Sequence, residues 1–277
     1  MSLKKQIINY LTLNKDFGVN LLFLDEKIKE NIKKIKPKIT PIYEDEIPIP
    51  ITNNVINDDI TKNKIKIKEL HENDSQTINI NTKLYQFNDI INLDDLNKQI
   101  ADCQNCILGT TRTNLVFGDG NPNADIMIIG EAPGSDEDEQ GLPFVGKAGK
   151  LLTDILKAIN LTRSDVYIAN ICKCRPPANR KPAIDEINAC EKYLHKQIEI
   201  IKPQFILALG LTAADALFKK SHKMADIRGK IFEYHGIKTL ITYHPAALLR
   251  NPNWKRPVWE DIRYLRAIYD TYLQTKI

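Results

Sequence analysis

Four short apolar segments alternate with helical patterns after residue 90, and this alternation constrains the fold more than any other feature of the chain. Length and composition indicate buried strands at residues 124–129, 166–171, 205–209 and 238–243. Helices are expected near Pro245 and at residues 94–101, 148–158, 184–201, 212–219 and about 257–273. Short buried strands that alternate with helices form parallel sheets covered on both faces. The sequence therefore predicts an α/β fold with a central four-stranded parallel sheet.

The first hundred residues have a different composition from the rest of the chain. They contain no Ala, Arg or Cys, and Gly18 is their only glycine. Residues 26–85 alternate charged residues with Ile and carry few aromatic residues, so they offer little apolar surface for a core. We interpret them as a largely unstructured, low-complexity linker, and residues 3–24 as a passive tail rather than a short amphipathic helix or hairpin. The predicted division is an N-terminal extension, residues 1–90, and a folded domain, residues 91–277.

Overall composition excludes few classes of protein. The chain of 277 residues carries a net charge of +4, which permits nucleic-acid binding without arguing for it. No apolar run reaches the length of a transmembrane helix, and no small-residue cleavage site follows the basic N-terminus. We expect a monomeric, cytoplasmic protein that has no contact with a membrane.

Residues 130–149, GEAPGSDEDEQGLPFVGKAG, carry the strongest indication of a binding site. Glu131 directly follows the first strand, and Phe144 lies in the loop before the next helix. Ligands of open α/β sheets bind at the carboxyl ends of the strands, so Glu131 and Phe144 are expected to face one pocket. There the carboxylate can activate water, and the ring can stack on a flat ligand.

The same segment contains G-x-x-x-x-G-K at residues 141–147, which is how a phosphate-binding loop begins. Ala148 stands where such a loop needs a hydroxyl to hold Mg²⁺, and Phe144 and Val145 are bulky for a loop whose amides approach phosphates. We therefore do not favour nucleotide hydrolysis. An ordinary strand–loop–helix turn is the simpler alternative, but it leaves the four acids at residues 136–139 unexplained.

The other strands also end in polar residues or glycine. The second strand ends near Asn170, the third at Gly210 and the fourth at His244. Right-handed crossovers place all the strand ends on one edge of the sheet. A carboxamide there can read a base edge as donor and acceptor, and an imidazole can stabilise a leaving anion. Taken singly, Asn170 could cap a turn, and His244 could be a buried structural histidine.

The five cysteines all lie after residue 100. Cys103 and Cys106 form a C-x₂-C pair, and Cys174 and Cys190 follow later. Four thiolates suit a structural zinc ion or an iron–sulfur cluster. Redox use of the pair is less favoured, because the pair follows a helix instead of opening one. We interpret the fifth cysteine, Cys172, as a small buried hydrophobic residue.

Six sequence blocks, covering about residues 95–275, occur in the order typical of one enzyme family. They resemble the family 4 uracil-DNA glycosylases, the iron–sulfur type of bacteria and archaea. The blocks are CQNCILGTTRTNLVFGDG, GEAPGSDEDEQGLPFVGKAGKLL, VYIANICKCRPPANRKP, EINACEKYL, LALGLTAADAL and HPAALLRNP. The N-terminal extension lies outside the resemblance.

The resemblance implies a uracil-DNA-glycosylase-like three-layer sandwich and a [4Fe–4S] cluster. The cluster would be held by Cys103, Cys106, Cys174 and Cys190, while Cys172 stands where the family usually has an aliphatic residue. We expect the cluster to be structural and to buttress the strand end that carries Asn170.

The resemblance also implies an activity, the hydrolysis of the N-glycosidic bond of uracil in DNA, whether the uracil arose by cytosine deamination or by misincorporation. The enzyme would flip the base out, release free uracil and leave an abasic site, which starts base excision repair. Phe144 would stack on uracil, Asn170 would bind its edge and His244 would stabilise the departing anion. Glu131, with the backbone of Ala132 and Gly134, would occupy the water-activating motif. The compact loop PPANRKPAIDE favours turnover over a trapped covalent adduct.

DNA contacts are expected on both sides of this pocket. Wedge and phosphate-contact candidates after His244 are Leu248, Leu249 and Arg250. Further phosphate-contact candidates are Lys173, Arg175, Arg180 and Arg228. The alternatives are helix core for the leucines and a solvated basic face for the cations. Two other functions stay open: a glycosylase of the same fold for another deaminated base, and a non-catalytic Cys₄ module that binds nucleic acid or a polymerase. Whether residues 1–90 bind a repair or replication protein also stays open.

Overall fold

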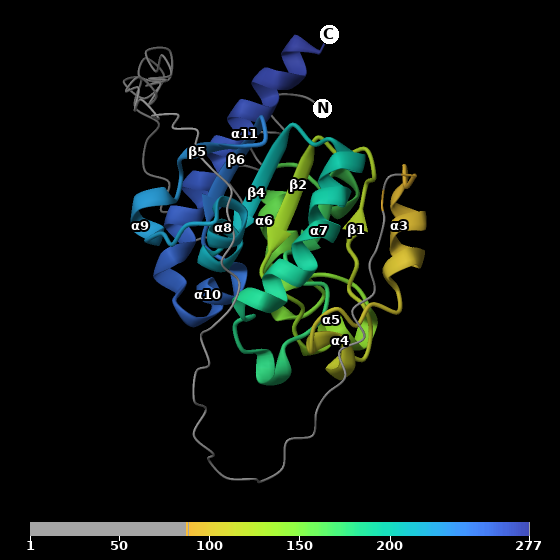
Figure 1. The fold of residues 1–277 in the computed structure, drawn as a ribbon. Coiled ribbons are helices and arrows are strands. Elements are labelled where there is room, and N and C mark those ends of the chain that lie inside the picture. The colour runs from red at the N-terminus through yellow and green to blue at the C-terminus, as the bar shows by residue number, and fades with distance from the viewer. Residues whose placement is uncertain (1–86, 88, 277) are drawn as a thin grey trace, which may run out of the picture. The chain divides into compact units, whose positions relative to one another are not determined.

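The computed structural model describes residues 87 and 89–276, and these form one sheet between two layers of helices (Figure 1). The predictions for the tail and the linker fall on residues 1–86 and lie outside the described residues. Of the helices in the described part, none combines the length and the apolarity that crossing a membrane requires.

Six strands form the sheet in the order β1-β3-β2-β4-β6-β5. Its four central strands are parallel, as predicted: β2 (Ile126–Gly130), β3 (Tyr167–Asn170), β4 (Phe205–Leu209) and β6 (Ile237–Thr242). Two antiparallel strands extend the edges: β1 (Asp119–Gly120) and β5 (Ile231–Tyr234). The sequence did not predict these edge strands, because β1 has 2 residues and β5 is mostly not buried.

Helices cover both faces of the sheet. One face packs against α3 (Leu93–Ile100), α7 (Ile184–Ile201) and α8 (Leu211–Phe218). The other packs against α6 (Lys147–Ala158), α10 (Pro245–Arg250) and α11 (Lys255–Thr275). Short helices lie in the connections: α4 (Leu108–Thr111), α5 (Ser135–Gln140), α9 (Met224–Ile227) and 3₁₀ turns at Arg163–Asp165, Pro177–Asn179 and Pro252–Trp254. The predicted helices are confirmed, with ends that differ by a residue or two.

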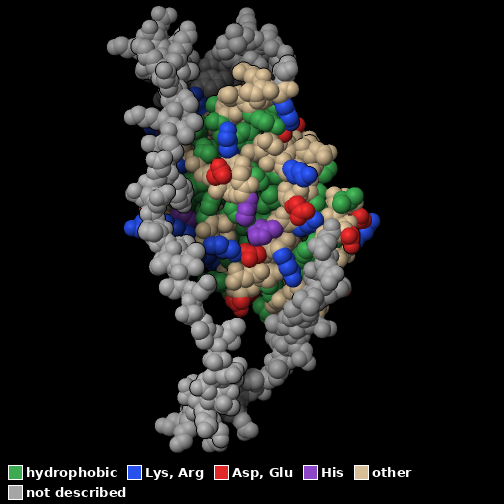
Figure 2. All heavy atoms as spheres, turned by 45° about the horizontal axis from the view of Figure 1, so that its top comes forward, with side chains coloured by type: hydrophobic (Ala, Val, Ile, Leu, Met, Phe, Trp, Pro, Cys, Tyr) green, Lys and Arg blue, Asp and Glu red, His purple; other side chains and the backbone are tan. Residues whose placement is uncertain are grey.

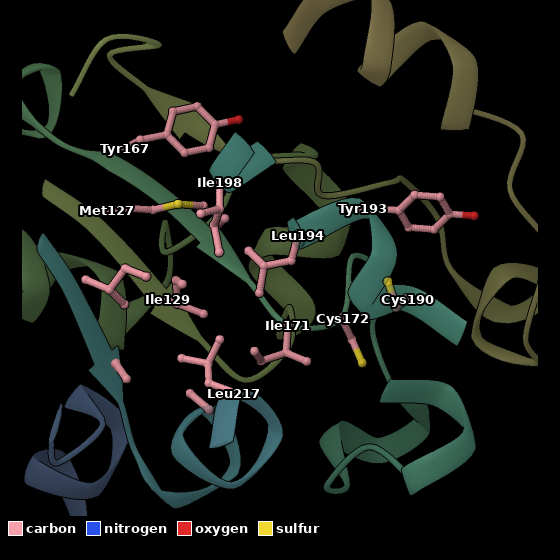
Figure 3. Packing of buried hydrophobic residues seen from close by; sticks show 14 of the residues in the cluster. Met127, Ile129, Tyr167, Ile171, Cys172, Cys190, Tyr193, Leu194, Ile198 and Leu217 are labelled. Carbon is pink, nitrogen blue, oxygen red and sulfur yellow. The ribbon is translucent and has the colours of Figure 1, made fainter. Parts of the chain in front are cut away.

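Residues of β2 alternate between the two halves of the core, because successive side chains of a strand point to opposite faces. Ile126 and Ile128 pack toward α6 and α11, whereas Met127 and Ile129 pack toward α7. Figure 3 shows Met127 and Ile129 on the same side of the sheet as Leu194 of α7. Burial on both faces explains why the strand is a continuous apolar run rather than an alternating one.

The order of the strands fixes where a ligand can bind. The chain passes from β2 to β3 on one side, then returns across β2 to β4 and β6 on the other. Such a reversal leaves a crevice at the carboxyl ends of the strands around the reversal point. The helices α4, α5 and α10 gather at this end of the sheet, the lower end in Figure 1.

The face of the molecule shown in Figure 2 carries charges of both signs. Lys and Arg side chains are interspersed with Asp and Glu on the face shown in Figure 2, and histidine side chains gather near its centre. This mixture matches the small net charge of +4. An interspersed surface does not focus a field of one sign onto a polyanion, so this face offers no electrostatic argument for DNA binding.

Candidate active site

A pocket of about 440 Å³ lies at the carboxyl ends of the parallel strands. It brings together the four side chains that the sequence predicted to converge there, Glu131, Phe144, Asn170 and His244. The backbones of Ala132 and Gly134 belong to its wall, and Arg180 and Arg250 lie among its other lining residues. The folding pattern therefore assembles one site from the segments that follow or end three strands, β2, β3 and β6.

Asn170 is the last residue of β3, and its side chain is 2% exposed. Within the described residues, its Oδ1 atom is buried without a hydrogen-bond partner. A Cβ atom at Gly130, opposite on β2, would lie 2.4 Å from that Oδ1 and 2.6 Å from Cζ of Phe144. Only glycine allows Asn170 and Phe144 to approach β2 this closely. A buried acceptor that lacks a partner usually awaits one from a ligand or water.

Phe144 lies in the loop between α5 and α6 with a φ of 54°, a left-handed conformation that is rare for a bulky residue. The surrounding structure holds it there. Arg163 donates to the carbonyl oxygens of Pro143 at 2.8 Å and Phe144 at 3.1 Å, and pairs with Asp119 at 3.2 Å. A conformation of this kind costs about 1–3 kcal/mol and is found mainly at functional sites.

The acidic run at residues 136–139, unexplained by the sequence, braces the loop. Glu137 Oε1 accepts from the amides of Val145 and Gly146, both at 2.9 Å, and Oε2 accepts from Gly134 at 3.2 Å. Asp138 is 3% exposed and accepts from the amide of Thr113 at 2.9 Å. The amides of Val145 and Gly146, which a phosphate-binding loop would offer to its ligand, already bind a carboxylate. This contact supports the rejection of nucleotide hydrolysis.

His244 ends the segment after β6 and caps α10. Its Nδ1 atom accepts from the amide of Ala246 at 3.2 Å, so the neutral ring carries its proton on Nε2. Burial, with a smaller contribution from the charge of Arg250, lowers the pKa of His244 to about 4. The ring is therefore neutral at neutral pH and keeps an N–H donor for a ligand. Gly210, with a φ of +90°, lies against it: a Cβ there would be 3.2 Å from Cβ of His244.

The cysteines surround a second, small space of about 10 Å³. Cys103 and Cys106 approach it from the segment after α3, Cys174 from the segment after β3 and Cys190 from α7. Among residues 87 and 89–276, no three His, Cys, Asp or Glu side chains are grouped as ligands of a single metal ion. Four soft thiols around one space are the donor set of an iron–sulfur cluster.

Hydrogen-bond donors are directed at the sulfur atoms. Arg112 donates to Cys174 Sγ at 3.0 Å, the amide of Lys173 donates to Cys190 Sγ at 3.3 Å, and the Tyr193 hydroxyl lies 3.0 Å from Cys103 Sγ. Such bonds tune iron–sulfur clusters and stabilise thiolates. The donor chemistry of the described residues therefore matches the cluster that the resemblance implied.

Cys172 is buried, as the sequence predicted, and is not among the residues that line the small space. Besides filling space in the core, Cys172 interacts with one of the other cysteines. A hydrogen bond from the Cys172 thiol lowers the pKa of the Cys190 thiol. Both cysteines are labelled in Figure 3, beside the buried cluster of α7.

Burial contradicts two of the predicted DNA contacts, and a third is engaged within the protein. Leu248 is 1% exposed and belongs to the core under α10, so it cannot be a wedge. The side chain of Lys173 is fully buried and cannot reach a phosphate. Arg228 pairs with Asp261 at 2.7 Å and also donates to a backbone carbonyl of α11.

The other predicted contacts are accessible. Leu249 is 48% exposed, and Arg250 beside it is exposed and lines the pocket. Arg180 also lines the pocket, although it forms two hydrogen bonds with Glu186, at 2.8 and 2.6 Å. Arg175 is partly exposed and donates to Asn179 at 2.8 Å.

Comparison with known proteins decides the family. Over residues 117–263, the sequence matches the uracil DNA glycosylase superfamily. The chain belongs to that superfamily. Type-4 uracil-DNA glycosylases of Saccharolobus solfataricus and Thermotoga maritima are 47% and 44% identical to it, over 184 and 176 residues. These alignments cover 63% and 62% of this chain, and 85% and 92% of those proteins.

A type-5 uracil-DNA glycosylase of Pyrobaculum aerophilum is more distant. It is 30% identical over 146 residues, which is 47% of this chain and 64% of that protein. The resemblance to the type-4 glycosylases, drawn from six sequence blocks, is therefore confirmed, as is the uracil-DNA-glycosylase-like fold.

Proposed function

We propose that this protein is a type-4 uracil-DNA glycosylase that hydrolyses the N-glycosidic bond of uracil in DNA and leaves an abasic site. The observation that carries the proposal is the buried, unpartnered Oδ1 atom of Asn170, in one pocket with Phe144 and a neutral His244. The named activity of the type-4 relatives supports it.

Recognition follows from the edges of the base. Uracil has an N3–H donor that matches Oδ1 of Asn170, and an O4 acceptor that matches the amide N–H₂. Cytosine has no proton on N3, so it would leave the buried Oδ1 unpaired at a cost of about 1–3 kcal/mol. Phe144 stacks on the face of the base, which any pyrimidine offers. Selectivity for uracil therefore belongs to Asn170 and affinity to Phe144.

His244 stabilises the departing base. Cleavage of the C1′–N1 bond leaves negative charge on uracil and positive charge on the sugar, as in other glycoside hydrolyses. The Nε2–H donor of a neutral imidazole can bind the uracil oxygen where that negative charge develops. A single donor of this kind is worth about 3–4 kcal/mol in the transition state.

Glu131 activates water for attack on the sugar, with the backbone of Ala132 and Gly134 beside it. Its place at the end of β2 and its half-buried position in the pocket support this role. If uracil leaves before water attacks, the water contributes less to the barrier than the leaving group does. We therefore expect His244→Ala and Asn170→Ala to lower activity more than Glu131→Ala.

The base reaches the pocket by leaving the DNA stack. Leu249 is the wedge, and Arg250, Arg175 and Arg180 contact phosphates around it. The exposure of Leu249 and the place of Arg180 and Arg250 in the pocket lining support this arrangement. Contacts of this kind release counterions, so binding should weaken steeply as salt rises.

A [4Fe–4S] cluster held by Cys103, Cys106, Cys174 and Cys190 is part of the proposal. When bound, the cluster supplies a rigid four-point crosslink and no step of the hydrolysis. It joins the segment after α3 to the end of β3 and to α7. We further propose that the enzyme acts as a monomer on DNA in the cytoplasm. Residues 1–90 are proposed as an N-terminal extension of the catalytic domain, residues 91–277, with Phe87 and Ile90 at its end packed against the core.

Strand cleavage tests the proposal. Anaerobically purified protein is incubated with end-labelled oligonucleotides that carry one uracil, either single-stranded or opposite guanine or adenine, and alkali then breaks the abasic sites. Hypoxanthine, xanthine and thymine mismatches serve as competing substrates. We expect cleavage at uracil that Asn170→Ala and His244→Ala both slow strongly without abolishing it. An iron-loaded wild type that leaves uracil intact would favour another base or a binding module.

A further inference from the structure

Lys173 is a fully buried lysine three residues after Asn170, and the mechanism above does not use it. Its Nζ atom donates to two neutral oxygens: the backbone carbonyl of Asn170 at 2.9 Å and Oε1 of Gln197 at 2.5 Å. Desolvation of an ammonium group is costly, so a lysine in such a place needs a specific reason to be there.

The sheet explains why a side chain is needed at this point. The edge strand β1 pairs with β3 only at Asp119–Ile168 and Gly120–Tyr167, so the pairing stops two residues before Asn170. Lys173 and Gln197 bridge the gap beyond the last strand pair, since Gln197 Nε2 donates to the carbonyl oxygen of Phe117 at 2.9 Å. Two side chains thus replace the pairing that ends at Asp119 and Ile168.

The backbone of Lys173 contacts the cysteine site and the segment before β1. Its amide donates to Cys190 Sγ at 3.3 Å, and its carbonyl accepts from the amide of Val116 at 2.8 Å. One residue therefore contacts a candidate cluster ligand through its amide and the peptide of Asn170 through its side chain. The path from the cysteines to the base-reading residue is two hydrogen bonds and one side chain long.

We propose that Lys173 is a positioning residue that couples the cysteine site to uracil recognition by Asn170. The inference rests on the proposed function, because that function assigns Asn170 to the uracil edge. Lys173 fixes the last peptide of β3, and this directs the unpartnered Oδ1 of Asn170 into the pocket. Without it the peptide keeps only the hydrogen bond from the amide of Ile171 to the carbonyl oxygen of Gly130, at 3.0 Å. The Asn170 carbonyl is then held less firmly, and the base edge is read less well although no group that touches the base has been removed.

A double-mutant cycle tests the coupling. Lys173→Met removes the donor but keeps the side-chain length and the amide that contacts Cys190. It is combined with Asn170→Ala, and single-turnover excision is measured on a single-stranded oligonucleotide with one uracil. We expect Lys173→Met to slow excision about 10-fold, the value of one hydrogen bond. In the Asn170→Ala background the same change should cost less than about twofold.

Two readouts do not depend on turnover. Affinity for free uracil, measured by titration calorimetry, should fall with Lys173→Met by the same factor as the excision rate. Iron content and the visible absorption of the purified protein should match the wild type. Gln197→Met, which removes the other acceptor of Nζ, should show the same dependence on Asn170 and carries the test if Lys173→Met does not fold.

If the wild type is active and the rate losses of the two single variants multiply in the double variant, the inference is wrong while the proposed function stands. A Lys173→Met protein that folds but loses its iron would also overturn the inference, because Lys173 would then serve the cysteines and not Asn170. A wild type that releases no uracil would overturn the proposed function, and the inference with it.

Discussion

The rings of Phe144 and His244 lie with their centroids 5.5 Å apart and their planes tilted by 32°. Phe144 comes from the loop between α5 and α6 and His244 from the segment after β6, so both rings line the pocket. His244 is neutral in this setting because burial lowers its pKa to about 4. A base bound in this pocket would meet a flat ring and an uncharged N–H donor.

Stability should depend on pH through His244. Its pKa is about 4 in the folded protein and 6.5 as the ordinary value, so between these values the unfolded chain binds more protons. The stabilisation is present above pH 6.5 and is lost as the pH falls toward 4, by about 2 kcal/mol between pH 7 and pH 5. Denaturant unfolding of the wild type and His244→Asn at both pH values measures this difference. Equal pH dependence in the two proteins would show that His244 is not buried in its neutral form.

Arg163 should control the position of Phe144. Arg163→Ala removes the donors that hold the carbonyls of Pro143 and Phe144, so the left-handed residue can relax. We expect excision to slow about 10-fold, as for the loss of one to two hydrogen bonds. The control is Arg266→Ala, a similarly half-buried arginine that pairs with Asp270 on α11. Steady-state kinetics on a single-stranded uracil substrate gives both values, and similar losses in the two variants would speak against the clamp.

Glu137 should matter for stability more than its neighbours do. Glu137→Gln replaces a carboxylate that accepts three amide hydrogen bonds with a group that has one acceptor oxygen. We expect the free energy of unfolding to fall by about 2 kcal/mol. Glu139→Gln, on the exposed side of the same helix, should change it by less than about 0.5 kcal/mol. Urea unfolding distinguishes the two, and a neutral Glu137→Gln would refute the bracing role.

Substitution of the two adjacent leucines of α10 should have different effects, one on stability and the other on excision. Leu248→Ala opens a cavity in the core and should lower the free energy of unfolding by about 3 kcal/mol. Leu249→Ala should leave stability unchanged, because its side chain is 48% exposed. It should slow excision from double-stranded DNA about 10-fold and leave single-stranded DNA unaffected, since only a duplex needs a wedge. If Leu249→Ala lowers the excision rate by the same factor on single-stranded and double-stranded DNA, Leu249 is not the wedge.

Sequence patterns predicted the buried parts of this fold well. The strands β2, β3, β4 and β6 are apolar throughout because both of their faces are covered, and their carboxyl ends met at one edge as expected. Edge strands escaped prediction because β1 is 2 residues long and β5 is half exposed, so neither leaves a strong pattern.

The roles of side chains were harder to predict where the residue type suggests one location and the fold places the residue in another. Glu137 lies in a run of four acids that resembles a solvated surface, and only the fold turns it toward the amides of the Phe144 loop. Leu248 and Leu249 are identical in type, so one residue of helical rotation decides which is core. Lys173 looked like a phosphate contact, because sequence alone does not show that a lysine side chain turns inward.

Inhibition by free bases tests the central claim, that Oδ1 of Asn170 reads the N3–H of uracil. Excision from a single-uracil strand is measured with uracil or 3-methyluracil as the inhibitor, using the wild type and Asn170→Ala. We predict that uracil inhibits the wild type at least about 10-fold more strongly than 3-methyluracil, which lacks the N3 donor. For Asn170→Ala, the inhibition constants of uracil and 3-methyluracil should differ by less than about twofold. Equal inhibition of the wild type by both bases would contradict the assignment of Asn170.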